Sequence, residues 1–297
     1  MSRPIATPYD GSSKLFQIGL SRLDMAEWIE VDERLGPYLD EKDRLAAAHP
    51  DETFRAEAGT EAAQAEVLAL LASHLPRRFP DIYRRDGEVM EIVPAGRRVR
   101  LDMPDAPLRI AAGLVQEDLV LMRRGGDGWR IAAASLCFPS SWRLGEKFGR
   151  PIHEVHAPVP GFGAGTRNAE LIGRMFDNLK PAIGVLRWNW SVYGDADLFH
   201  PHDSPPRRFG AGERAETVFL RVERQTLRRL PQSGDILFTI GIAVDPLEML
   251  ERHSDAARIA AALIGQLETL DAAQLDYKGM TLERDRLIAR LREIGSA

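Results

Sequence analysis

Residues 118–137 hold two apolar segments separated by a glycine-rich turn, and this pattern constrains the fold more than any other part of the chain. The first segment begins Asp118-Leu-Val-Leu-Met, and the second begins Trp129-Arg-Ile-Ala-Ala-Ala. The sequence between them, Arg124-Gly-Gly-Asp-Gly, supplies residues that tolerate the backbone angles of a tight turn. We therefore predict an antiparallel hairpin, and with it a fold that contains an antiparallel sheet.

Three more strands are predicted after this hairpin, at residues 183–193, 216–224 and 235–244. The second of them alternates strictly between two sets of residues, Val218, Leu220 and Val222 on one side and Phe219, Arg221 and Glu223 on the other. Between the hairpin and these strands, a helix is predicted from Asn168, as its N-cap, to Lys180, where Pro181 ends it.

Helical patterns flank the strand-rich region on both sides. Ala, Leu and Glu dominate between Asp40 and Leu75, where Thr60 is expected to cap a helix, and a helical tail with a break near 271–280 follows Asp245-Pro. Strands do not alternate regularly with helices, so the α+β class fits better than a doubly wound sheet. We predict three parts: an N-terminal helical extension (1–80), a core (81–245) and a C-terminal helical segment packed on that core (246–297).

Composition excludes several classes of protein. A hydrophobic content of 44% and a charged content of 28% are ordinary for a globular chain of 297 residues. The net charge is -5 and no stripe of Lys and Arg stands out, which argues against nucleic acid as a partner. No apolar run approaches the roughly 18–20 residues that span a bilayer, and the N-terminus lacks the apolar core of a secretory signal. We therefore expect a cytoplasmic protein with no membrane partner.

The chain has one cysteine, Cys137. An iron–sulfur cluster held by cysteines needs about four thiolates, which this chain cannot supply alone. Electrons delivered through such a cluster would have to come from another polypeptide.

Histidines are the scarce candidates for metal ligands. The pair in His200-Pro-His202-Asp203 could hold one metal if the segment were extended, but it lies in a proline-rich loop with no obvious third ligand. A surface loop is the better interpretation of that segment.

His153 and His156 are three residues apart, so they would share one face of a helix. Pro158 biases Ala157 away from helical geometry, which places His156 at or just past the end of an element. An imidazole held in this way suits axial ligation of a haem iron. On spacing alone, a structural histidine remains the better interpretation.

Arginines are dense in Leu220-Arg-Val-Glu-Arg-Gln-Thr-Leu-Arg-Arg-Leu-Pro. On a strand, Arg221 and Glu223 share one face, and Arg224 lies on the other. An arginine on a mostly apolar face needs an anion, which could be a haem propionate or a carboxylate of the core. The sequence does not choose between the two.

Several segments together resemble the haem-dependent oxidative N-demethylase α-subunit family. The longest runs from Cys137-Phe-Pro-Ser-Ser-Trp through Arg150-Pro-Ile-His-Glu-Val-His-Ala-Pro-Val-Pro-Gly-Phe. The others are Arg187-Trp-Asn-Trp, the arginine-rich segment, Ile236-Leu-Phe-Thr-Ile and Tyr277-Lys-Gly, in the order expected for the family.

The resemblance implies a PAS-like antiparallel sheet core that binds haem b. It implies His156, the histidine before Ala-Pro-Val-Pro, as the iron ligand, with His153 ranked second. Arg221, Arg224 and Asn189 become candidates for the haem edge or pocket. Tyr277, Glu223 and Arg224 become candidate catalytic residues, and Tyr193 is a further polar group to consider. Cys137 is not expected to be the ligand.

The implied reaction is the oxidative N-demethylation of a small secondary amine, such as dimethylamine, to a primary amine and formaldehyde. O2 would be the oxidant, and a separate reductase with flavin and an iron–sulfur cluster would supply electrons from NADPH. A non-catalytic haem-binding sensor or carrier with a PAS-type fold is the alternative. A scaffold that has lost its haem is a third possibility.

Overall fold

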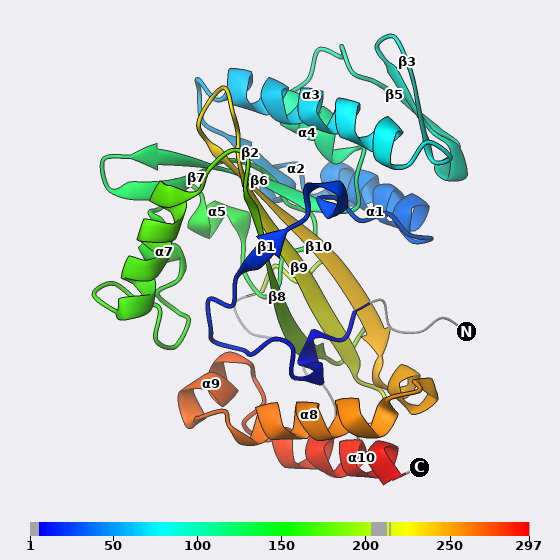
Figure 1. Ribbon diagram of the computed structural model, residues 1–297, viewed down its shortest axis with the longest axis vertical. Coiled ribbons are helices and arrows are strands. Elements are labelled where there is room, and N and C mark those ends of the chain that lie inside the picture. The colour runs from blue at the N-terminus through cyan, green and yellow to red at the C-terminus, as the bar shows by residue number, and fades with distance from the viewer. Residues whose placement is uncertain (1–5, 203–212, 214, 297) are drawn as a thin grey trace.

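A computed structural model describes residues 6–202, 213 and 215–296, and its main feature is a seven-stranded antiparallel sheet. The strand order is β1-β8-β9-β10-β6-β7-β2 (Figure 1). The strands are β1 (Ser21–Leu23), β2 (Phe54–Ala56), β6 (Asp118–Gly125), β7 (Gly128–Ser135), β8 (Gly184–Tyr193), β9 (Phe219–Arg229) and β10 (Ile236–Pro246). The predicted α+β class and the hairpin at 118–137 are confirmed.

A smaller sheet and several helices complete the chain. The three-stranded sheet contains β3 (Tyr83–Asp86), β4 (Val89–Ile92) and β5 (Arg97–Arg100). The helices before β8 are α1 (Leu35–Ala48), α2 (Pro50–Thr53), α3 (Glu61–Arg78), α4 (Pro107–Ala112), α5 (Leu144–Lys147), α6 (Ile152–Val155) and α7 (Arg167–Asn178). Those after β10 are α8 (Ala256–Glu268), α9 (Ala272–Tyr277) and α10 (Arg284–Ser296). Short 3-10 helices are η1 (Pro8–Asp10), η2 (Met25–Glu27), η3 (Val93–Ala95) and η4 (Leu247–Arg252).

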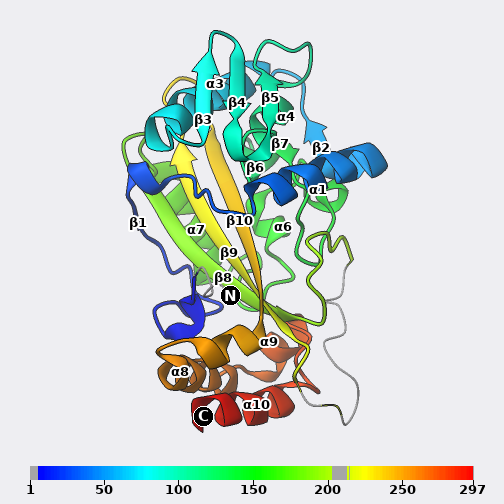
Figure 2. The same ribbon diagram turned by 90° about the vertical axis from the view of Figure 1, so that its right-hand side faces the viewer.

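The two faces of the large sheet pack against different helices. The α7 face, as we call it, carries Val185 of β8, Leu227 of β9 and Ile240 of β10, which join one apolar cluster with Phe176 of α7. The opposite face packs against α1, α3 and α4 near one end and against α8 and α10 near the other, and α1 also adds Tyr38 and Leu45 to the cluster of the α7 face. Figure 2 shows the two helical groups at opposite ends of the long strands. The sheet is therefore the shared wall between all three clusters.

Several boundaries differ from the sequence prediction for local reasons. Strand β9 continues to Arg229 because it pairs with β10 along its whole length, from Phe219↔Pro246 to Arg229↔Ile236. The cap of α7 is Thr166, whose hydroxyl accepts the Ala169 N–H, whereas Asn168 donates its side-chain amide to the Gly161 carbonyl. The predicted break at 271–280 contains α9, which a capping box at Asp271 begins.

The first 80 residues also do more than form helices. Strand β1 pairs with β8, and strand β2 pairs with β7, so the predicted N-terminal extension supplies both edge strands of the large sheet. Thr60 precedes α3 as expected, but its hydroxyl donates to the Glu57 carbonyl instead of capping the helix.

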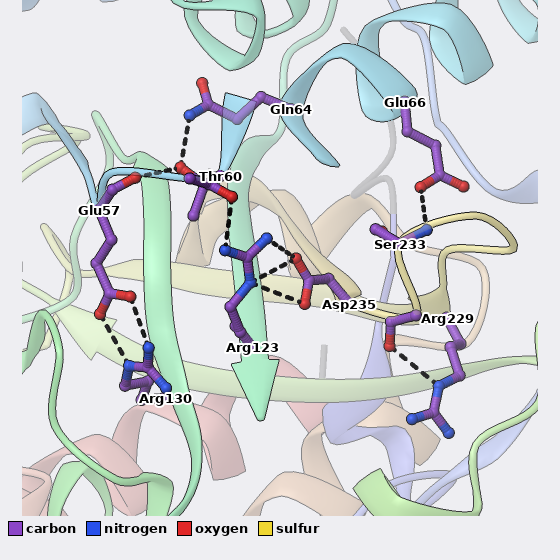
Figure 3. Close-up of polar contacts among 11 residues, drawn as sticks. Glu57, Thr60, Gln64, Glu66, Arg123, Arg130, Arg229, Ser233 and Asp235 are labelled. Carbon is purple, nitrogen blue, oxygen red and sulfur yellow. Dashed lines mark hydrogen bonds and ion pairs between the residues drawn. The ribbon is translucent and has the colours of Figure 1, made fainter. Parts of the chain in front are cut away.

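Charged side chains connect the turn between β9 and β10 to strand β6 and to helix α3 (Figure 3). Arg123 of β6 pairs with the buried Asp235 through Nη2 and Oδ2, 2.7 Å apart. The carboxylate of Glu66 on α3 accepts the backbone N–H groups of Gln232 and Ser233. The turn is thus tied to a strand and to a helix at once. Within the described part of the chain, no helix is long and apolar enough to cross a membrane.

Candidate functional site

His156 lies at the C-cap of α6, as the proline spacing predicted. Pro151 precedes that single helical turn, and the His156 N–H donates to the Ile152 carbonyl at its end. The imidazole packs edge-on against the ring of Phe162, with 6.3 Å between ring centroids. Phe162 belongs to the apolar cluster of the α7 face, so His156 sits beside that face.

The surroundings of His156 keep its imidazole neutral. Burial, and then the positive charges of Lys147 and Arg187, lower the pKa of His156 to about 4. At neutral pH one ring nitrogen therefore carries a free lone pair, which is the form of histidine that binds metals. His153, the second-ranked candidate, lies within the single turn of α6 and is also partly buried.

Strands β8 and β9 place four polar side chains on the α7 face. In the strand register, Arg187 lies opposite Gln225 and Asn189 lies opposite Glu223. Arg187 Nη1 donates to Gln225 Oε1 at 3.1 Å, and Gln225 Nε2 donates to Glu223 Oε2 at 2.7 Å. Asn189 Nδ2 donates to the same carboxylate oxygen at 3.3 Å. One connected network therefore crosses the two strands.

Glu223 is ionised although it is buried. Burial alone would raise its pKa, but the hydrogen bond from Ser140 Oγ, the charges of Arg221 and Lys278 and the bond from Asn189 outweigh it and lower the pKa. Its carboxylate accepts hydrogen bonds from three side chains, those of Ser140, Asn189 and Gln225. Such an anion can hold an ammonium group or accept a hydrogen bond.

The C-terminal segment reaches the same network through Tyr277 and Lys278. Lys278 Nζ donates to the Trp190 carbonyl at 2.8 Å, to Ser191 Oγ and to Asn189 Oδ1. Tyr277 keeps 39% of its surface exposed, and its ring packs edge-on against Phe16. Burial of the hydroxyl, and then the charge of Glu223, raise the pKa of Tyr277 to about 12, so the phenol stays protonated.

Arg221 and Arg224, two of the predicted site residues, both use their guanidinium groups in bonds to other protein groups. Arg221 is fully buried and donates to Ser140 Oγ and to backbone carbonyls at Phe138 and Leu198. These bonds fit the core interpretation of that arginine, and they support Glu223 through Ser140.

Arg224 points to the opposite face of the sheet. It pairs with Glu30, Nε to Oε1 at 2.9 Å, and donates to the carbonyls of Trp28 and Glu27. Its predicted roles at the haem edge and in catalysis do not fit this position, because the sheet separates it from His156.

Two cations beside His156, Arg187 and Lys147, were missed as site residues. Arg187 stands two positions before Asn189, and on a strand this spacing puts both on one face, so the signal was available. Lys147 ends the single turn of α5, and no periodicity in the sequence reveals that its side chain is enclosed. Burial lowers the pKa of Lys147 to about 8.

The remaining candidates are structural. His200 is buried, its ring lies 4.6 Å from that of Tyr193, and its Nε2 bonds to the Asp197 carbonyl. Tyr193 in turn bonds Ser141 through its hydroxyl. Asp203, Pro205 and Pro206 of that loop lie outside the described residues. No group of three or more His, Cys, Asp or Glu able to hold a metal ion occurs in the part of the chain that is described.

Cys137 is buried, and burial followed by the charge of Asp118 raises the pKa of its thiol to about 12. Its thiol is therefore protonated at neutral pH.

Several apolar side chains in the cluster of the α7 face are not fully buried. They come from α5–α7 and from the sheet, and they pack against the cluster of the α7 face: Phe148, Ile152, Val159, Met175, Val185 and Phe238. An apolar surface with a few convergent polar groups is the usual setting for a flat hydrophobic ligand.

Comparison with known families identifies the chain at this point. Residues 19–288 match a family model described as haem-dependent oxidative N-demethylase, alpha subunit-like. The match covers all of the elements that carry His156, Arg187, Glu223 and Tyr277.

Proposed function

Since the chain belongs to the haem-dependent oxidative N-demethylase, alpha subunit-like family, we propose that it binds haem b through His156 and demethylates a small secondary amine. The observation that carries the proposal is the neutral imidazole of His156, held at the end of α6 beside the half-buried apolar side chains of the α7 face. An imidazole of this kind is a common axial ligand of haem iron.

A buried hydrogen-bond donor near His156, on Arg187, also suits a haem. Arg187 Nε is buried and has no hydrogen-bond partner among the described residues. A buried donor left unpaired costs free energy, so this nitrogen favours an anionic group next to His156. Haem b carries two such groups, its propionates, on one edge of an apolar ring.

The haem would supply the binding and reduction of O2 and the oxidation of the N-methyl carbon. In the balanced reaction, the secondary amine, O2, two electrons and two protons give the primary amine, formaldehyde and water. The single cysteine means that an iron–sulfur cluster with cysteine ligands would lie in a separate reductase, which would also carry flavin and use NADPH.

The protein would contribute charge and protons from the network on β8 and β9. The Glu223 carboxylate, kept ionised by its hydrogen bonds and by the charges of Arg221 and Lys278, would hold the amine nitrogen of the substrate. The Tyr277 hydroxyl, protonated and partly exposed, would donate a hydrogen bond at the entrance to the site. Asn189, bonded to both Glu223 and Lys278, would fix the position of that carboxylate.

The decisive experiment replaces the ligand and then restores an imidazole. We expect His156→Gly to lose the Soret band of bound haem, because the axial bond is gone, and free imidazole to restore it in part. His153→Gly, three residues away, is the matched control and should keep the wild-type spectrum. Haem bound by His156→Gly with an unchanged axial spectrum would rule out His156 as the ligand.

Turnover is tested separately with dimethylamine, O2 and a chemical reductant. Formaldehyde release that requires all three supports the demethylase. Haem binding without formaldehyde would instead support a sensor or carrier with no turnover.

A further inference from the structure

Arg187 and Lys147 approach His156 from different elements, β8 and α5. Both positive charges lie close enough to the imidazole to act on it. Neither cation forms an ion pair with a carboxylate within the ranges that the structure describes. Two partly buried positive charges therefore lie near the predicted iron ligand.

The hydrogen bonds of Arg187 leave part of its guanidinium unused. Nη1 donates to the neutral Gln225 Oε1, and Nη2 makes only a long contact of 3.4 Å with the Gln17 carbonyl. Nε has no partner in the described part of the chain, although it is buried. A guanidinium normally binds a carboxylate through two parallel N–H groups, and here Nε is free for such a bond.

Lys147 is held by an aromatic ring instead of an anion. Its Nζ lies 4.2 Å from the ring centroid of Trp142, which attracts a cation but leaves the three N–H groups free to donate. The ring thus holds the ammonium group near the site without neutralising it.

Glu223 is the carboxylate that acts on both cations, but it does not pair with either. Its two oxygens accept from Ser140, Asn189 and Gln225, and Gln225 separates it from Arg187. A partly buried cation without an ionic partner favours an anion beside it, above all at the buried Arg187 Nε. An anionic ligand would supply that partner.

We propose that Arg187 and Lys147 bind the two propionate carboxylates of the haem, one cation to each. This inference rests on the proposed function, because it assumes that His156 faces the same ligand. The proposal also predicts how the haem is oriented. Its propionate edge would lie toward β8 and α5, and its apolar edge toward Val159, Met175 and Phe238.

The test compares ligands that differ only in iron or in carboxylates. Apo-protein is titrated with haem b, with metal-free protoporphyrin IX and with protoporphyrin IX dimethyl ester, using the Soret band and porphyrin fluorescence. Arg187→Met and Lys147→Met are the test variants, and Arg150→Met and Lys180→Met, at exposed positions, are the matched controls. Far-UV circular dichroism checks that each variant is folded.

We expect each test variant to bind protoporphyrin IX about 10- to 100-fold more weakly, the loss that corresponds to one charge-assisted hydrogen bond. Their affinity for the dimethyl ester should stay within about threefold of wild type, a difference of less than 1 kcal/mol. The controls should match wild type with all ligands. His156→Gly should weaken haem binding while leaving the binding of metal-free protoporphyrin unchanged.

Two results would overturn the proposal. If the wild type binds the diester as tightly as the diacid, or if both test variants bind the diacid like wild type, the carboxylates are bound elsewhere, even though haem binding stands. If the wild type binds neither haem b nor protoporphyrin IX, the haem function and the propionate contacts fail together.

Discussion

Glu117, just before β6, is a buried acid on the side of the sheet away from His156. Its Oε1 accepts the Glu30 N–H, and its Oε2 has no partner in the described part of the chain. Arg224, Lys42 and Glu30 surround it, and Lys42 donates to the Glu117 backbone carbonyl. Burial outweighs these contacts and raises the pKa of Glu117 to about 7.

We predict that Glu117→Gln makes the protein more stable at pH 8 and its stability less dependent on pH. Because the folded pKa of Glu117 lies above the unfolded value, the contribution of its proton to stability is complete below about pH 4.5 and is lost as the pH rises through 7. The gain at pH 8 should be about 2 kcal/mol, from the cost of a buried charge. Urea unfolding at pH 5, 6.5 and 8 measures it. A wild-type-like pH slope in the variant would show that the Glu117 carboxylate is already ionised at low cost.

At the scale of single residues, Pro158 predicted that His156 lies at or just past the end of an element, and the structure confirms that position. The sequence could not reveal the lowered pKa of the imidazole, which depends first on burial and then on the charges of Lys147 and Arg187 from other parts of the chain. Arg224 was assigned to the wrong environment because the family motif marks the residue but not the partner, Glu30, that holds it.

At the scale of elements, Lys278 adds a polar connection between the C-terminal segment and β8, beside the Trp190–Gln266 hydrogen bond. Strand β1 covers β8 only between Gly184 and Leu186, so the rest of that edge lacks a neighbouring strand among the described residues. On this part of the edge, Lys278 Nζ donates a hydrogen bond to the Trp190 carbonyl in place of a neighbouring strand.

We predict that Lys278→Met lowers the free energy of unfolding by about 2–3 kcal/mol, because buried acceptors on β8 lose a charged donor. Without the contact from Lys278, Asn189 should hold Glu223 less firmly, and the KM for the amine should rise more than kcat falls. Lys180→Met, at an exposed position, is the control for loss of a lysine. An unchanged KM in a destabilised Lys278→Met would limit this lysine to a structural role.

Strand faces were the part of the elements that sequence predicted best. The alternation in 218–223 placed Arg221 and Glu223 on one face, and the structure confirms it. The edge strands β1 and β2 escaped prediction because each has three residues, too few to show a period. Their pairing is decided by distant partners, which local patterns do not encode.

At the scale of the whole molecule, one sheet joins clusters that lie in different parts of the sequence. Leu237 of β10 belongs to the cluster of α3, and Ala243 of the same strand belongs to the cluster of α8. The three parts predicted from sequence are 1–80, 81–245 and 246–297. Strand β10 of the central part therefore packs against helices of both flanking parts.

We predict that these clusters unfold together. Leu263→Ala in α8 and Leu71→Ala in α3 each remove a fully buried side chain and should cost about 3 kcal/mol. In a cooperative molecule, Leu263→Ala should speed the slowest amide exchange of α3 by about 100-fold, and Leu71→Ala should do the same for α8. Hydrogen exchange followed by mass spectrometry measures both. Protection in α3 that survives Leu263→Ala would mean that the C-terminal segment unfolds alone.

The two edge strands of the large sheet have a consequence for the newly made chain. The Ser21 hydroxyl of β1 donates to the Leu186 carbonyl of β8, 165 positions later. Strand β2 likewise pairs with β7, which is synthesised after it. The outermost strands of the sheet therefore leave the ribosome before the strands they cover. Strand β1 can pair with β8 only after Leu186 has left the ribosome. Until then, the backbone groups of β1 form hydrogen bonds with solvent or with a chaperone.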